Sequence, residues 1–137
     1  MKVYNILALA SVPALCCSLT SCFRDAEDYV EDSADILNEA AELLDEATPS
    51  NADEIADDIN DLVDELKELQ KEAKEDEEEL KKEVDAMSTD EKAELMKPLM
   101  EAGMKFGFAL EKAQRNGAME NSKLQKAVMS LMSAKPM

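Results

Sequence analysis

NADEIADDINDLVDELKELQKEA, residues 51–73, carries the clearest structural pattern in the chain. Apolar residues recur there at alternating intervals of four and three, with acidic residues between them: Ile55, Ile59, Leu62, Leu66, Leu69 and Ala73. This period is typical of an amphipathic α-helix with a coiled-coil-like seam. Such a helix must bury its apolar stripe against a partner.

The preceding residues supply that partner. A similar seam runs through Val30, Ala34, Leu37, Ala41 and Leu44 and predicts a helix over about 23–47. It should end near Pro49, because a residue before proline is disfavoured in the α region. The turn Thr48-Pro49-Ser50-Asn51 is short, so the next helix should run antiparallel to the first, with Asn51 as its N-cap and Glu54 as the capping-box partner.

The second helix is predicted to continue from about 52 to 86, well beyond the end of its partner. Residues 70–79 contain only Ala73 as an apolar residue, and Glu77 and Lys81, like Glu78 and Lys82, stand at the i,i+4 spacing and in the order that favour ion pairs. This part therefore predicts a solvated helix. The seam then resumes out of phase at Leu80, Val84 and Met87, which is a stutter.

Two further helices are predicted. Ser88 and Glu91 form a capping-box pattern that begins a helix over about 89–114, with a kink expected at Pro98. The segment from 99 to 110 is apolar on nearly all sides and is expected to be the most deeply buried part of the molecule. Gly117 ends this helix, and Asn121 or Ser122 begins a last one over about 121–133.

These elements predict an all-α fold: an antiparallel hairpin or bundle of three to four helices in a single domain, residues 22–137. Residues 23–66 carry 17 acids and one base, whereas residues 95–137 carry three acids and seven bases, within a net charge of −17. We expect the C-terminal helices to fold back onto the acidic hairpin, with their bases at the seam. The competing arrangement leaves these helices as a detached arm that binds a partner.

The methionines and glycines of the third helix are candidate functional residues. Met96, Met100 and Met104 stand four residues apart, and thioethers are ligands that suit Cu(I). Core packing is the favoured interpretation of this row, and the copper site is a weak candidate. Gly103 and Gly107 match GxxxG, which we interpret as a place where another helix of the bundle approaches closely.

The sequence gives little support for catalysis, for a calcium site or for nucleic-acid binding. The chain has no histidine, and no G-x-S-x-G, S-x-x-K or glycine-rich phosphate loop occurs in it. The acids around 53–64 lack the glycine-turned pattern of an EF-hand loop and predict a solvated helix face. We therefore expect no catalytic residues, no enzyme activity and no resident metal. The strong negative charge also argues against binding nucleic acid.

All three cysteines of the chain lie within its first 22 residues. Lys2 precedes an apolar run that is too short to span a bilayer, and the run ends in Leu19-Thr20-Ser21-Cys22. This ending resembles the lipobox of bacterial lipoproteins over the first 22 residues. The resemblance implies a signal peptide over 1–21 and a covalent lipid, a diacylglyceryl thioether, on Cys22. Cleavage would remove Cys16 and Cys17 and leave no free thiol.

The function expected from these patterns is a lipid-anchored, non-catalytic protein of the bacterial cell envelope that binds or spaces other envelope components. If the cell is Gram-negative, an outer-membrane or cell-surface location is favoured over the inner membrane. Its expected partners are the membrane, through the lipid, and an envelope protein. The alternative function is a carrier of a small ligand or of copper that uses the Met/Phe-rich segment 96–108.

Overall fold

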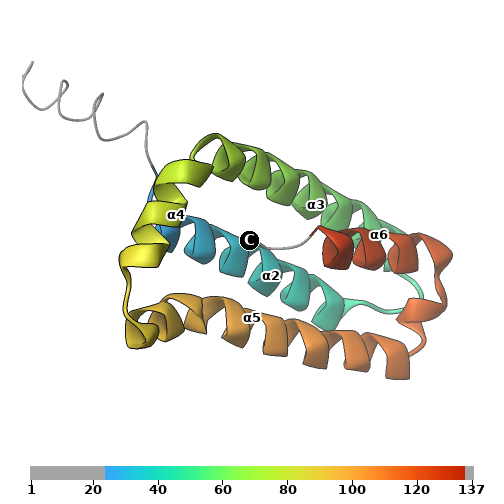
Figure 1. The fold of residues 1–137 in the computed structure, drawn as a ribbon. Helices are drawn as coiled ribbons and strands as arrows, with labels where there is room; N and C mark the ends of the chain where they lie inside the picture. The colour runs from blue at the N-terminus through green and yellow to red at the C-terminus, as the bar shows by residue number, and fades with distance from the viewer. Residues whose placement is uncertain (1–23, 135–137) are drawn as a thin grey trace, which may run out of the picture.

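The computed structural model describes residues 24–134, which form helices joined by short turns (Figure 1). Cys22 and the predicted signal peptide lie outside the described residues. The elements, in order, are α2 (Ala26–Glu46), α3 (Ala52–Glu75), α4 (Glu77–Ala86), α5 (Thr89–Arg115), the 3₁₀ turn η1 (Ala118–Glu120) and α6 (Ser122–Ser133). The predicted all-α class is confirmed.

Four of the helices form a bundle. α2 and α3 are the predicted antiparallel hairpin, α5 packs along α2, and α6 packs along α3 (Figure 1). α2 and α5 run in the same direction, as do α3 and α6. The C-terminal helices therefore fold back onto the hairpin, and the detached arm is wrong. Two of the predicted bases lie at these seams: Lys112 pairs with Asp45 across α5 and α2, and Lys123 pairs with Asp57 across α6 and α3.

The predicted continuous helix over 52–86 is wrong, because the chain breaks at Asp76 and α4 turns across the end of the hairpin. A straight helix would leave Leu80 in solvent beyond the start of α2. The turn instead buries Leu80. Two contacts hold α4 there: the amide N of Ala26 donates to Glu83 Oε2 at 3.0 Å, and Tyr29 Oη donates to Asp76 Oδ2 at 2.9 Å.

The predicted helix ends are mostly confirmed. The capping box of Ser88 and Glu91 is complete, and Gly117 has a φ of 86°, a left-handed conformation that glycine adopts readily. Asn121, not Ser122, begins α6 by accepting bonds from two amides. Asn51 does not cap α3; its side chain instead accepts from Thr48 N at 2.6 Å and closes the turn.

The deepest part of the core lies away from α5. The largest side chains with almost no exposure come from α2, α3 and α6: Leu44, Ile59, Leu66, Leu124 and Leu131. α5 contributes one buried face, made of Leu99, Ala102, Phe106, Ala109 and Ala113. The prediction that segment 99–110 is the most deeply buried part is therefore wrong. α5 packs mainly on α2, so only one side of it is covered.

Candidate functional site

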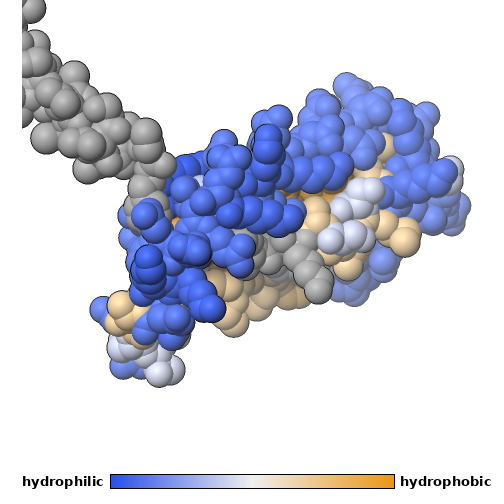
Figure 2. Space-filling view, turned by 45° about the horizontal axis from the view of Figure 1, so that its top comes forward, coloured by the Kyte–Doolittle hydropathy of each residue, from blue (hydrophilic) through white to orange (hydrophobic). Residues whose placement is uncertain are grey.

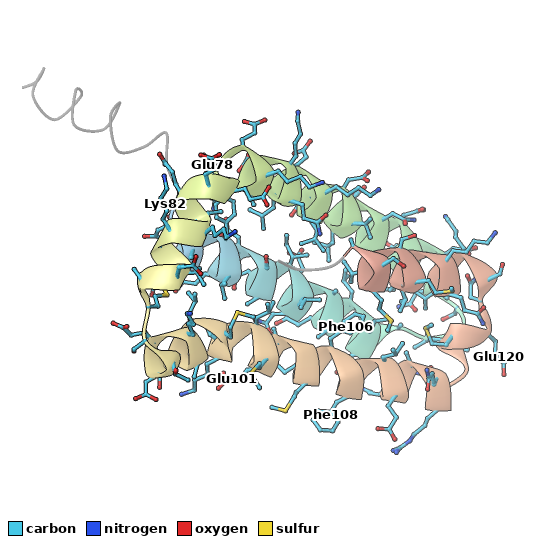
Figure 3. The ribbon with its side chains drawn as sticks, in the orientation of Figure 1. Glu78, Lys82, Glu101, Phe106, Phe108 and Glu120 are labelled. Atoms are coloured by element: carbon cyan, nitrogen blue, oxygen red, sulfur yellow. The ribbon has the colours of Figure 1, made fainter. Side chains whose placement is uncertain are left out.

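The outer face of α5 carries a row of exposed apolar side chains. Met96, Met100, Met104 and Phe108 stand four residues apart and are 36%, 67%, 62% and 72% exposed. Residues at this spacing lie on one helical face. Figure 3 shows Phe108 extending away from the bundle, whereas Phe106 on the same helix is buried. We call these four residues the α5 stripe.

Gly103 and Gly107 lie beside the stripe. Both are exposed, and a Cβ added at either position meets no atom within 4 Å. The prediction that they admit another helix of this bundle is therefore wrong. Because these two glycines have no side chains, the outer surface of α5 is recessed beside the methionines. Any helix approaching closely at GxxxG would have to come from outside the described bundle.

The charges around the stripe are mixed. Lys97, Glu101 and Lys105 are all exposed residues of α5. Glu111 pairs with Arg115, and Lys112 pairs with Asp45 at 2.8 Å. Figure 2 brings the α3 side of the molecule forward, and the face that it draws is mostly hydrophilic, interrupted by hydrophobic surface only in patches. The stripe is thus apolar surface on the least acidic part of a strongly acidic chain.

The exposed methionines overturn one interpretation. Core packing is the interpretation that the sequence favours for Met96, Met100 and Met104, but all three reach solvent. The four-residue rise of a helix is about 6 Å, so the backbones of Met96 and Met104 lie about 12 Å apart. The structure thus spreads these thioethers along a surface and does not gather them around a point. Their binding of copper stays a prediction.

A second feature is an apolar pocket at the corner where α2, α4 and α5 meet. It has a volume of about 610 Å³. Of the residues 96–108, only Met96 lines it. Sequence reasoning missed the pocket because it depends on the turn of α4. The stutter at Leu80 and Val84 was the signal available in the sequence. The lining residues are Ala26, Tyr29, Val30, Ser33, Glu77, Leu80, Lys81, Val84, Lys92, Leu95 and Met96.

Tyr29 stiffens one wall of this corner. Its hydroxyl donates to Asp76, and the guanidinium of Arg24 lies 5.1 Å from the centre of its ring. Burial and the bond to Asp76 raise the pKa of Tyr29 to about 12. Tyr29 is therefore a neutral structural donor near pH 7 and not a group tuned for proton transfer.

No family model matches the chain, and no curated protein and no solved structure is significantly similar to it.

The described residues offer neither a membrane span nor a cluster of metal-binding side chains. Between residues 24 and 134, no helix has both the length and the apolarity needed to cross a membrane. Over the same range, no three or more carboxylates are grouped so that they could hold a metal ion.

Proposed function

We propose that this protein is a lipid-anchored, non-catalytic lipoprotein of the bacterial envelope, located at the outer membrane or cell surface, and that it binds another envelope component through the α5 stripe. Two features support the proposal: the lipobox-like sequence ending at Cys22, and the apolar row on α5. The exposed apolar row of the α5 stripe is the main observation in favour of partner binding.

Exposed apolar residues that occur singly are ordinary, but a continuous row is a mark of an interaction site. Full burial of a methionine or phenylalanine side chain stabilises by about 1.5–3 kcal/mol. Four such side chains in one row therefore offer a substantial gain to a partner. Methionine suits this role because its flexible side chain adapts to different surfaces.

Charge would favour particular partners. Like-charged surfaces disfavour association, and α2 and α3 are strongly acidic. The α5 stripe avoids that field, since Lys97, Lys105 and Lys112 lie on the same helix. An apolar partner surface with a neutral or acidic rim fits this face best.

Site-specific photocrosslinking in intact cells tests the proposal. A photoreactive phenylalanine analogue at position 104 should capture a defined envelope protein, which mass spectrometry then names. The matched control places the same analogue at Glu78, an exposed residue of α4 (Figure 3). Identical products from both positions, or no product from position 104, would refute partner binding by the stripe.

The anchor needs its own test. Growth with a labelled fatty acid should mark the protein, and Cys22→Ser should abolish the label. A Cys22→Ser variant that is still labelled would rule out Cys22 as the lipid attachment site. The result is independent of the crosslinking experiment, so anchoring and partner binding are judged separately.

A further inference from the structure

The corner pocket lies where the packing of the core is interrupted. A domain usually has one contiguous apolar core. Here the buried residues between 24 and 134 divide into two clusters, and the smaller contains Val30, Ala34, Leu99 and Ala102. The pocket wall takes Tyr29 and Leu80 from the larger cluster and Val30 from the smaller. The pocket is therefore a gap at the junction of the two clusters, partly open to solvent, and Leu95 of its wall packs against both clusters.

The gap has the size of a ligand site. A volume of about 610 Å³ falls within the range of about 300–1,000 Å³ found for small-molecule pockets. Side chains of Ala26, Val30, Leu80, Val84 and Leu95 make most of its wall apolar. An apolar group filling it would gain dispersion contacts with these side chains.

Three polar groups indicate which kind of ligand fits. Ser33 is the one buried polar residue among those described; it is 7% exposed and lines the pocket. Lys81 and Lys92 also line the pocket, and neither is ion-paired within residues 24–134. Among the described residues that line the pocket, Glu77 is the only acid. The pocket thus has an excess of positive charge in a chain of net charge −17.

We propose that this pocket binds the hydrocarbon chain of a single-chain amphiphile with an anionic head group, of the fatty-acid class. The chain lies against Val30, Leu80 and the ring of Tyr29. The head group contacts Lys81 and Lys92, and the hydroxyl of Ser33 supplies a buried hydrogen-bonding group. The proposal does not depend on the α5 stripe binding a partner.

Calorimetric titration tests this with two probes, dodecanoate and dodecanol, each below the concentration at which it self-associates. The protein is the chain from residue 22 with Cys22→Ser, so that no attached lipid interferes. Both probes should bind at one site, dodecanoate more tightly. Lys81→Gln with Lys92→Gln should weaken dodecanoate about fivefold, the order of one exposed ion pair, and leave dodecanol unchanged. The matched control, Lys97→Gln with Lys105→Gln, should alter neither.

Filling the gap gives the second test. Ser33→Leu and Val84→Trp each add apolar volume from a different wall, and either should abolish binding of both probes while the helical circular dichroism is retained. Using both variants protects the test against one of them failing to fold. Absence of dodecanoate binding to the unfilled chain, or undiminished binding in both filled variants, would overturn the proposal. Equal weakening of the two probes by the lysine substitutions would overturn the role of the head group.

A third experiment distinguishes a free amphiphile from the protein's own lipid as the source of the hydrocarbon chain. The lipidated protein extracted from membranes is titrated beside the Cys22→Ser chain. Dodecanoate binding to both assigns the pocket to a free amphiphile. Binding to the Cys22→Ser chain alone assigns it to the acyl group of the protein's own anchor, which has the same chemistry.

Discussion

At the scale of single residues, two phenylalanines on α5 have opposite roles. Phe106 is 7% exposed and belongs to the core, whereas Phe108 is 72% exposed. Phe106→Ala should lower the free energy of unfolding by about 3–5 kcal/mol, because it leaves a cavity. Phe108→Ala should change it by about 0.5 kcal/mol or less. Urea unfolding followed by circular dichroism measures both, and equal losses would contradict the orientation of α5.

Tyr29 predicts a pH dependence. Its pKa is raised to about 12 in the folded chain, first by burial and then by the bond to Asp76, against about 10 in an unfolded chain. Below pH 10 both states keep the proton, so the contribution to stability is constant. Between pH 10 and 12 the unfolded state loses it first, and the free energy of unfolding should fall as pH rises.

Tyrosinate absorbance measures this directly, because Tyr29 is the single tyrosine from residue 22 onward. The midpoint in the folded chain should lie at about 12, and the corresponding fall in stability should be missing from Tyr29→Phe. A midpoint of about 10 in the folded protein would contradict the buried, bonded tyrosine.

At the scale of elements, α4 is the part whose position matters most. It closes the end of the hairpin through Leu80, which is 6% exposed. Leu80→Ala should lower the free energy of unfolding by about 2 kcal/mol or more, because the corner loses its main apolar contact. Lys82→Ala, on the exposed side of the same helix (Figure 3), should cost about 0.5 kcal/mol or less. Chemical denaturation compares the two, and similar small effects would mean that α4 does not pack on α2.

At the scale of the whole molecule, the excess of acidic over basic residues should influence the stability of the bundle. Acids outnumber bases by 32 to 15, while the described inter-helix pairs of the C-terminal half are few, including Lys112–Asp45 and Lys123–Asp57. Screening should relieve the repulsion among α2 and α3 more than it weakens exposed pairs. The thermal midpoint should therefore rise between low salt and about 0.15 M, where the screening length is about 8 Å. Calorimetry at a series of NaCl concentrations checks this; a falling midpoint would show that attractive pairs dominate.

Local signals predicted much of this architecture. The alternating spacing from Val30 to Ala73, Pro49 near the turn, and the capping box at Ser88 were sufficient for the helices and the hairpin, because these features depend on neighbours within a few residues. The charge difference between the two ends of the chain also favoured the fold-back that the structure confirms.

Local signals did not predict which surfaces of a helix are covered by another helix. The methionines at 96, 100 and 104 and the glycines at 103 and 107 suggested a buried segment, but α5 has a partner on one side only, so they face solvent. The break at Asp76 follows from the length of α2, since the chain turns beside the start of α2, where Tyr29 bonds Asp76. The sequence by itself determined most of the helices and helix ends and the acidic face through short-range periodicity. The tertiary structure alone decided the exposed α5 stripe and the corner pocket, because both depend on contacts between residues far apart in the chain.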